Sequence, residues 1–328
     1  MNRQAVFRAE TWRLKEPFHI SRGVRTEAIV TVVEISAAGH VGRGESVPYA
    51  HYGESQDSVI AQMQGVRKAI EGGCSRQDLL QLMPAGAARN AIDCALWDLE
   101  AKMAGRTVYE LAQARPALAP VTALTIGIGT VGEMAFKAAM LRDCGLIKVK
   151  LNRHDVVEKV RAIRAEAPKP RMIVDPNESW DIELLSEVHG DLATLGVDML
   201  EQPLPAGADQ VLDDFRCMVA LCADESCHTT ADLTTLENRY DIVNIKLDKT
   251  GGLTEALALK RTAEARGFRV MVGCMIGTSL AMTPALVLAN GAEFIDLDGP
   301  VWMEQDRVGG LLIEDGRIEP GPKPLWGQ

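Results

Sequence analysis

Acidic residues stand directly after three successive apolar runs that are rich in β-branched residues. The runs end at Asp175, at Glu201 and just before Asp224. If they are neighbouring parallel strands, their carboxyl ends meet at one edge, so the three carboxylates point to a common place. Crowded carboxylates repel one another unless a cation holds them, and ligation by oxygen alone favours Mg²⁺, with Mn²⁺ as the alternative, over Zn²⁺. For any one acid, a solvated loop residue or a helix N-cap is the competing interpretation.

Lysines occupy similar positions: Lys148, Lys150 and Lys246 also follow apolar strand residues. Lys148 and Lys150 share one face, because side chains two residues apart on a strand point the same way, and so do Asp296 and Asp298. We expect a lysine directed into a barrel beside a divalent cation to have a lowered pKa and to act as a base near neutral pH. The alternative is an ordinary lysine whose ammonium group reaches solvent.

Eight short β-rich runs, with a helical stretch in each of the seven gaps, must position these side chains. Their starts recur every 21 to 27 residues from Val121 onward. This alternation predicts a parallel sheet, and eight strands predict closure into a barrel, with a doubly wound open sheet as the alternative. No G-x-G-x-x-G follows a strand to support the open sheet. The eight predicted strands are Thr122–Ile126, Ile147–Leu151, Arg171–Asp175, Val197–Glu201, Met218–Ala223, Ile242–Lys246, Arg269–Gly273 and Glu293–Leu297.

A closed barrel places Lys150 and Lys246 on opposite sides of its mouth. They lie on the second and sixth predicted strands, four apart in a ring of eight. A substrate carboxylate bound to the metal would present its α-carbon to one lysine on each face. One lysine could then remove the α-proton and the other could return it from the opposite side, with the cation stabilising the enediolate formed in between. The arrangement predicts inversion of a stereocentre by two bases.

The first third of the chain has the pattern of an α+β domain. Strands are expected over Gln4–Leu14 and Glu27–Ser36, with a third ending near Glu45, and helices over Gln56–Glu71 and Ala87–Met103. Proline-containing residues 115–120 then resemble a linker, and a small hairpin is predicted over residues 311–319. The predicted fold class is therefore α/β. Residues 116–305 form a modified TIM barrel, (β/α)7β, and residues 1–115 form an α+β capping domain to which the C-terminal tail, residues 306–328, returns.

Composition narrows the partners. The 328 residues include 35 Lys and Arg against 45 Asp and Glu, a net charge of −10, which disfavours nucleic acid and anionic lipid. No apolar run approaches the about 20 residues of a membrane span, and the N-terminus lacks the apolar core of a signal peptide. Seven cysteines without C-x-x-C, with Cys217, Cys222 and Cys227 interpreted as ordinary thiols, favour a cytoplasmic protein. The oligomeric state stays open, a homo-oligomer included.

Several segments resemble the muconate-lactonizing subgroup of the enolase superfamily. The K-x-K at residues 148–150 is one, and the others are Asp175–Trp180 (DPNESW), Glu201–Pro205 (EQPLP), Ala223–Ser226 (ADES) and Lys246–Gly252 (KLDKTGG). The resemblance implies that Asp175, Glu201 and Asp224 hold Mg²⁺. It also implies that Lys150 and Lys246 are the acid/base pair and that Lys148 assists the substrate carboxylate. Pro176 is a departure, because the family usually has a smaller residue after the first ligand.

Asp296-Leu297-Asp298-Gly299-Pro300 is similar to the dipeptide epimerases, in particular those acting on L-Ala-D/L-Glu. The resemblance implies an epimerase that inverts the α-carbon of the C-terminal residue of a dipeptide, with L-Ala-L-Glu and L-Ala-D-Glu from murein recycling as the expected pair. Asp296 and Asp298 would bind the substrate ammonium group. Arg25, with Arg22 as the second choice, would bind the glutamate side chain, since arginine suits planar carboxylates. Thr125 and Met275 are further candidates for substrate binding.

Other functions remain open at this stage. Within the superfamily they are a cycloisomerase, an o-succinylbenzoate synthase or an epimerase with another dipeptide preference. A Schiff-base aldolase on a TIM barrel and a binding protein without turnover are alternatives from other classes. A mandelate-racemase type is disfavoured, because none of the six histidines lies at the end of the seventh predicted strand, and His228 is interpreted as an ordinary helix-start residue.

Overall fold

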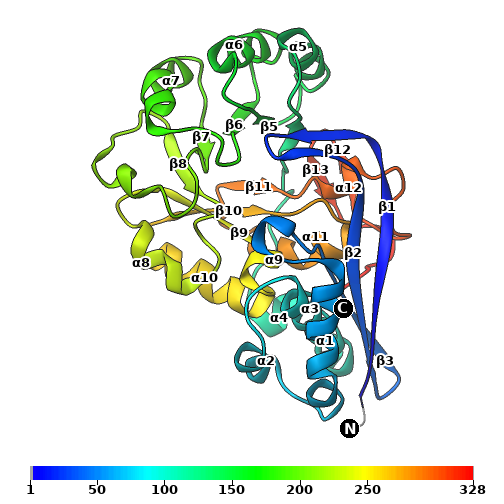
Figure 1. The fold of residues 1–328 in the computed structure, drawn as a ribbon. Helices are drawn as coiled ribbons and strands as arrows, with labels where there is room; N and C mark the ends of the chain where they lie inside the picture. The colour runs from blue at the N-terminus through cyan, green and yellow to red at the C-terminus, as the bar shows by residue number, and fades with distance from the viewer. Residues whose placement is uncertain (1–2, 328) are drawn as a thin grey trace.

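The computed structural model describes residues 3–327, and its N-terminal third is an antiparallel sheet in the order β1-β2-β3 with helices packed against it (Figure 1). The two predicted helices and three strands of this region are all present, and shorter helices follow. The elements are β1 (Gln4–Ile20), β2 (Gly23–Ala37), β3 (His40–Ser46), η1 (Ala50–Tyr52), α1 (Gln56–Glu71), α2 (Arg76–Leu82), α3 (Ala87–Ala104) and α4 (Val108–Ala112).

Helix α3 lies very close to the sheet because β3 has glycines at the contact. A Cβ atom added at Gly42 would lie 2.1 Å from the carbonyl oxygen of Ala95, and one at Gly44 would lie 2.0 Å from that of Ala91. Only glycine therefore permits this approach of strand and helix backbones. The helix ends at Gly105, which takes a left-handed φ of 60° as the C-terminal cap.

The first two strands extend further toward each other than the predicted Gln4–Leu14 and Glu27–Ser36. Strand β1 continues to Ile20 and pairs with β2 from Gly23 onward, so only a two-residue turn remains between them. Pro17, which has no amide hydrogen, lies where the ladder changes register, and pairing resumes after it. The long hairpin carries its tip to the cavity that the barrel lysines also line.

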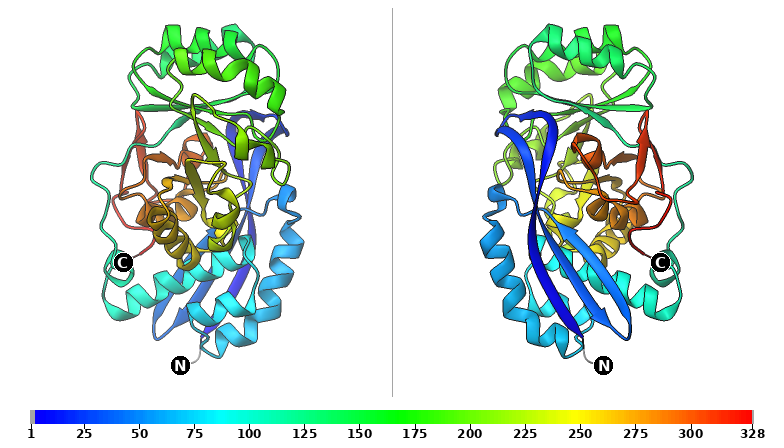
Figure 2. Two further views of the ribbon diagram at one scale, coloured as in Figure 1. Left: turned by 90° about the vertical axis from the view of Figure 1, so that its left-hand side faces the viewer. Right: turned by 90° about the vertical axis from the view of Figure 1, so that its right-hand side faces the viewer.

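The remainder of the chain forms eight parallel strands in the order β11-β10-β9-β8-β7-β6-β5-β4. The amide of Ala123, beside β4, donates a 2.7 Å hydrogen bond to the carbonyl of Ile295 on β11, so the sheet is nearly closed. The predicted modified TIM barrel with an N-terminal capping domain is confirmed, and Figure 2 shows the two parts side by side. The strands are β4 (Leu124–Ile126), β5 (Leu146–Lys150), β6 (Arg171–Asp175), β7 (Met199–Glu201), β8 (Ala220–Ala223), β9 (Ile242–Lys246), β10 (Arg269–Gly273) and β11 (Phe294–Asp296).

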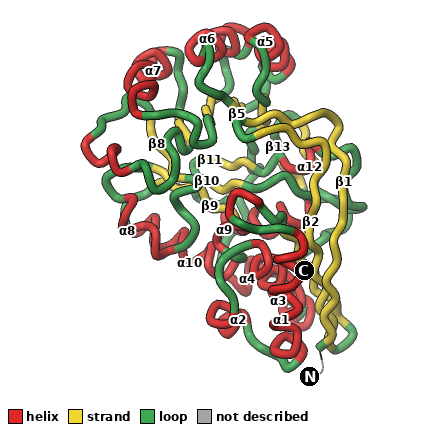
Figure 3. Tube along the Cα trace, viewed as in Figure 1, coloured by secondary structure: helices red, strands yellow, loops and turns green. Residues whose placement is uncertain are grey.

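Helices lie outside the barrel strands (Figure 3). The segment between β7 and β8 is less helical than predicted. It contains only a 3-10 helix, because Pro203, Pro205 and Gly207 disfavour an α-helix there. The barrel helices are α5 (Val131–Met140), α6 (Val156–Glu166), α7 (Ile182–Thr194), η2 (Gln210–Asp214), η3 (Thr230–Asp232), α8 (Leu233–Leu236), α9 (Leu247–Thr250), α10 (Leu253–Ala265), α11 (Ser279–Ala285), η4 (Leu286–Leu288) and α12 (Gly299–Trp302).

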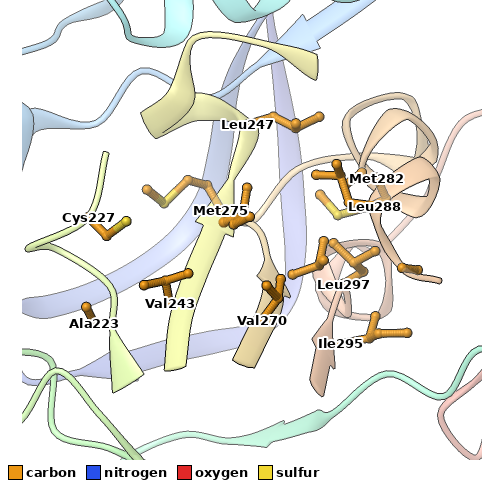
Figure 4. Packing of buried hydrophobic residues seen from close by; sticks show 14 of the residues in the cluster. Ala223, Cys227, Val243, Leu247, Val270, Met275, Met282, Leu288, Ile295 and Leu297 are labelled. Atoms are coloured by element: carbon orange, nitrogen blue, oxygen red, sulfur yellow. The ribbon is translucent and has the colours of Figure 1, made fainter. Parts of the chain in front are cut away.

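Side chains inside the barrel form two layers, because alternate residues of each strand point inward. Intervening residues such as Val243, Val270 and Ile295 belong to the outer core together with Met282 and Leu288 (Figure 4). The lower layer, the floor of the barrel, is apolar. Two positions further along the strands the inward side chains become polar, so a polar layer lies on top of an apolar one. The floor consists of Ala123, Leu146, Ile173, Met199, Cys222, Ile242, Met271 and Phe294.

The C-terminal tail forms the hairpin of β12 (Leu312–Glu314) and β13 (Arg317–Glu319) and then contacts the N-terminal third. Trp326 Nε1 donates to the carbonyl of Cys94 at 2.9 Å, and the amide of Gly327 donates to Asp98 Oδ1 at 2.8 Å. Both acceptors lie on α3. These contacts support the proposed return of the tail to the capping domain, and we retain the division at residues 115 and 305 as a proposal.

All seven cysteines are free thiols, and Cys222 and Cys227 are buried while Cys217 is half-buried. This agrees with their interpretation as core and surface thiols. Within residues 3–327, no helix combines the length and the apolar character needed to cross a bilayer.

Candidate active site

The polar layer above the floor brings predicted acids together around one lysine. Lys148 Nζ lies 3.1 Å from Asp175 Oδ2, 2.7 Å from Glu201 Oε2 and 2.8 Å from Asp296 Oδ2. Each of these four side chains belongs to a residue that is 5% exposed or less. Lys148 therefore stands among carboxylates from three other strands, β6, β7 and β11.

Lys150 and Lys246 approach the acid cluster from separate strands. Lys150 Nζ donates to Asp175 Oδ2 at 2.5 Å, and Lys246 Nζ donates to Asp224 Oδ2 at 2.6 Å. Their strands, β5 and β9, are four positions apart in the eight-stranded sheet. Both lysines line one cavity, so a ligand in it would meet an amine from each of two well-separated strands.

The pKa values of Lys148 and Lys246 are raised above the ordinary value of a lysine. Burial alone would lower the pKa of Lys148, but attraction to four carboxylates, led by Asp296, outweighs burial and holds the pKa well above its ordinary value. Burial opposes and Asp224 favours the charged form of Lys246, and its pKa is also raised. The lowered pKa predicted for a lysine beside a divalent cation stays a prediction, because in this arrangement the ammonium groups of Lys148 and Lys246 pair directly with the acids.

Two oxygens of the acid cluster have ion-pair partners but accept no well-directed hydrogen bond from the described residues. Glu201 Oε2 and Asp224 Oδ1 are buried and accept no well-directed hydrogen bond within residues 3–327, although each has a lysine ammonium group at 2.7 Å. Burial and the neighbouring charge of Asp175 raise the pKa of Glu201 to about 7. In this arrangement the lysine ammonium groups lie between the acids. Within residues 3–327, no three acidic, histidine or cysteine side chains are therefore close enough together to hold a metal ion. An all-carboxylate donor set with unsatisfied oxygens fits a hard divalent cation.

Asp296 and Asp298 form a separate acidic pair, and both side chains point the same way, as their spacing predicts. Asp296 and Asp298 both line the cavity, while Leu297 between them joins the outer core. Asp298 Oδ2 accepts hydrogen bonds from the Thr125 amide at 2.9 Å and from Trp302 Nε1 at 3.2 Å. Burial and the charge of Asp296 raise the pKa of Asp298 to about 6. Asp296 Oδ1 accepts no hydrogen bond from any described residue, so the pair retains the capacity to bind a cationic group.

The cap hairpin borders the same cavity. Arg22, at its tip, donates to Glu225 Oε1 at 2.7 Å and to Glu178 Oε2 at 2.9 Å. Arg25 instead places its guanidinium carbon 4.9 Å from the centre of the Tyr49 ring. Arg25, rather than Arg22, is thus available to an anionic ligand. The predicted Met275 belongs to an apolar wall formed by Phe18, Ile20, Tyr52, Cys274, Met275 and Ile276.

Two buried side chains of the site escape the sequence analysis. Asn244 points inward from β9 and donates from Nδ2 to Glu201 Oε1 at 2.8 Å. Lys249 is 1% exposed, contacts Asp224 Oδ1 at 2.7 Å and donates to three backbone carbonyls. The alternation of side chains along β9 could have identified Asn244. No local sequence pattern identifies Lys249. All four residues of α9 are buried, so the helix has no alternation of buried and exposed positions that would single out this lysine.

The loop after β6 accommodates Pro176 without displacing the carboxylate of Asp175. Asp175 Oδ1 accepts a 2.8 Å hydrogen bond from the amide of Asn177, and both Asn177 and Glu178 have left-handed φ angles, 46° and 64°. The carbonyl of Asn177 in turn accepts a 3.2 Å hydrogen bond from Arg22 of the cap hairpin. The turn therefore orients one acid of the cluster and joins it to the cap.

His228 lies two residues before η3, and its amide donates to Asp232 Oδ2 at 2.9 Å. Its ring also packs edge-on against Tyr52, with ring centres 4.6 Å apart. Burial lowers its pKa, which favours a neutral imidazole in this contact.

Both parts of the chain match known families. The mandelate racemase / muconate lactonizing enzyme N-terminal domain matches residues 2–112, and the enolase C-terminal domain-like family matches residues 133–327. The L-Ala-D/L-Glu epimerase of Escherichia coli (strain K12) is 49% identical over 311 residues, which cover 94% of this chain and 97% of that protein. The N-acetyl-D-glutamate racemase of a Pseudoalteromonas species is 43% identical over 298 residues, covering 90% and 94%.

Solved structures agree with this grouping. An enolase family member from Agrobacterium tumefaciens with homology to dipeptide epimerases, holding sodium and L-Ala-L-Glu, superposes with a TM-score of 0.96 at 46% identity and covers 99% of this chain and 100% of that one. A dipeptide epimerase from Cytophaga hutchinsonii complexed with Mg and D-Ala-L-Val gives 0.90 at 30% identity, covering 97% and 93%. Cap, barrel and sequence thus lead to one family, and the protein belongs to the mandelate racemase/muconate lactonizing branch of the enolase superfamily.

Proposed function

We propose that the protein is a Mg²⁺-dependent epimerase that inverts the α-carbon of the C-terminal residue of a dipeptide, with L-Ala-L-Glu and L-Ala-D-Glu as its substrates. The observation that carries the proposal is the meeting of two lysines from separated strands, Lys150 and Lys246, in one cavity with a second acidic pair. The family, the relatives named as epimerases and the neighbours with bound dipeptides support the same class of reaction.

The two lysines divide the work of proton transfer. One amine removes the α-proton of the substrate, and the other, still protonated, donates a proton to the opposite face of the planar enediolate. Lys148 places a positive charge beside the carboxylate of the substrate, because neighbouring acids keep its ammonium group protonated. For a lysine to act as base, its pairing with Asp175 or Asp224 must weaken when substrate and cation enter.

Asp175, Glu201 and Asp224 would hold the cation. Bound there, a divalent cation would supply positive charge that makes the α-proton of a nearby carboxylate more acidic. The buried oxygens of Glu201 and Asp224 that accept no well-directed hydrogen bond from the described residues support this assignment. Asn244 fixes the other oxygen of Glu201 by its 2.8 Å hydrogen bond.

The acidic pair on the last strand supports a substrate with a free amine. Asp298 is fixed by Thr125 and Trp302, and Asp296 has one oxygen without a hydrogen bond among the described residues. An ammonium group placed between them would offset the repulsion between two crowded carboxylates. Arg25 would receive the side-chain carboxylate of glutamate. We further propose murein-derived peptides as the source of the dipeptide and the cytoplasm as the compartment, which the free thiols support.

The test is an incubation of L-Ala-L-Glu with the metal-free protein in D₂O, with and without added Mg²⁺, followed by ¹H NMR. Loss of the glutamate α-hydrogen and appearance of the L,D diastereomer only with Mg²⁺ would support the proposal. Absence of exchange in every dipeptide tried would overturn it. Parallel assays with N-acetylglutamate test the substrate class: Asp298→Asn should impair turnover of the dipeptide, and exchange of N-acetylglutamate alone would replace the dipeptide assignment while leaving the chemistry intact.

A further inference from the structure

The two arginines of the cap hairpin have different surroundings. Arg22 is saturated: it donates to Glu225 at 2.7 Å, to Glu178 at 2.9 Å and to the hydroxyl oxygen of Tyr49 at 3.0 and 3.2 Å. Two carboxylates therefore neutralise its charge. Although Arg22 lines the cavity, its hydrogen-bond donors are already used within the protein.

Arg25 is the opposite case. Within residues 3–327 its guanidinium forms no ion pair and no hydrogen bond, and its one specific contact is with the ring of Tyr49, whose centre lies 4.9 Å from the guanidinium carbon. A guanidinium held over an aromatic face is stabilised by the ring while its N–H groups stay free for a planar acceptor. Among the described residues, Arg25 thus keeps an unpaired positive charge beside the cavity.

Tyr49 connects the two arginines and is itself held in place. The residue is 7% exposed, and its ring packs edge-on against Tyr52 with ring centres 5.1 Å apart. Its amide donates to Glu54 Oε2 at 3.0 Å, and Glu54 Oε1 accepts from the amide of Ala87 at the start of α3 at 2.8 Å. The ring is therefore anchored to the rigid part of the cap, and Arg22 fixes its hydroxyl end.

We infer that Tyr49 is a specificity-determining positioning residue. Its ring holds the Arg25 guanidinium at the cavity wall, with its donors free, for the side-chain carboxylate of the C-terminal residue of the substrate. Arg22, with Glu178 and Glu225, locks the hairpin without competing for that carboxylate. The inference deepens the proposed function and rests on it, because it assigns selection of an acidic side chain to a residue that acts through Arg25.

The experiment measures a discrimination ratio, kcat/KM for L-Ala-L-Glu divided by kcat/KM for the neutral isostere L-Ala-L-Gln, by α-hydrogen exchange in D₂O. The ratio is independent of the fraction of active protein, so partial unfolding of a variant does not affect it. Tyr49→Leu removes the ring and should lower the ratio about 3- to 30-fold, the range expected for loss of a cation–π contact. Tyr49→Phe keeps the ring and should retain most of the ratio. Phe7→Leu is the matched control, because Phe7 supports Arg67 at 4.6 Å on another part of the cap.

The outcomes separate the inference from the function on which it rests. In an Arg25→Met background, Tyr49→Leu should cause no further loss of the ratio, since the ring acts only through Arg25. A wild-type protein that prefers L-Ala-L-Glu together with a Tyr49→Leu variant of unchanged ratio would overturn the inference alone. A ratio that falls as far in Tyr49→Phe as in Tyr49→Leu would also overturn it, because the hydroxyl would then be the active group. A wild-type protein that acts on neither dipeptide would overturn both.

Discussion

Replacing Arg307 with methionine should destabilise the protein by about 3–5 kcal/mol, the cost of leaving a buried charge unpaired. Arg307 Nη2 lies 2.6 Å from Glu45 Oε2 and 2.6 Å from Glu10 Oε2, and the Glu45 side chain is fully buried. Glu45 also accepts from the amide of Thr278 at 2.8 Å, just beyond the cavity wall at Met275. Arg307 therefore joins the tail, the cap sheet and the loop after β10 through one buried carboxylate.

The cost should depend on pH in a defined direction. Burial raises the pKa of Glu45, and Arg307 opposes that rise. Without Arg307 the pKa in the folded state rises further above that of the unfolded chain. The folded state then binds more protons between the two values, so stability falls as the pH rises through that window. The loss on Arg307→Met should be larger at pH 8 than at pH 5.

Urea unfolding of a double-mutant cycle measures this directly. Glu45→Gln removes the buried charge, so adding it to Arg307→Met should recover part of the lost stability. Arg266→Met is the control, because its ion pair with Glu237 is at the surface, with side-chain exposures of 35% and 49%, and should contribute less than about 1 kcal/mol. The reasoning fails if Arg307→Met costs no more than this control, or if its cost is independent of pH.

Two other predictions concern the cap and its contact with the barrel. Gly42→Ala should destabilise the fold by about 1–3 kcal/mol or more, because the new Cβ would lie 2.1 Å from the α3 backbone. Gly65→Ala in α1, where a Cβ would have no atom within 4 Å, should instead stabilise the fold by about 0.5–1 kcal/mol. Chemical denaturation would disprove this if the two changes in stability had the same sign. Asp248 accepts from Asn90 and from the Val47 amide, yet burial raises its pKa from 3.8 to about 7. Its charge therefore reduces stability as the pH rises from about 4 to about 7. Asp248→Asn should flatten the pH dependence of unfolding in that range, and an unchanged profile would count against the prediction.

Much of the barrel site follows from local pattern. Because strand side chains alternate, the position of a charged residue near a strand end predicts which face it occupies. Lys148 and Asp296 therefore fall in one polar layer, and Lys150, two residues further along β5, lines the same cavity. The apolar floor follows from the same alternation, because its residues lie two positions before the polar layer on each strand. The order of the strands then supplies the separation of β5 from β9.

The cap contacts and the protonation of the site could not be predicted in this way. The bond between Arg22 and Glu225 joins residues 203 positions apart, and no local pattern encodes such a contact. The raised pKa of Lys148 arises from acids on three other strands, whose charges act only after the barrel closes. The extension of β1 to Ile20 depends on pairing that resumes beyond Pro17, against the usual effect of proline on a ladder.

The central claim is that Lys150 and Lys246 serve opposite faces of the substrate α-carbon. It is tested most directly by α-hydrogen exchange in D₂O with the variants Lys150→Ala and Lys246→Ala, each given L-Ala-L-Glu and L-Ala-D-Glu separately. We predict that each variant exchanges the hydrogen of only one epimer, that the two variants choose different epimers, and that neither interconverts them. A variant that exchanges both epimers, or that still epimerises at the wild-type rate, would contradict the two-base account.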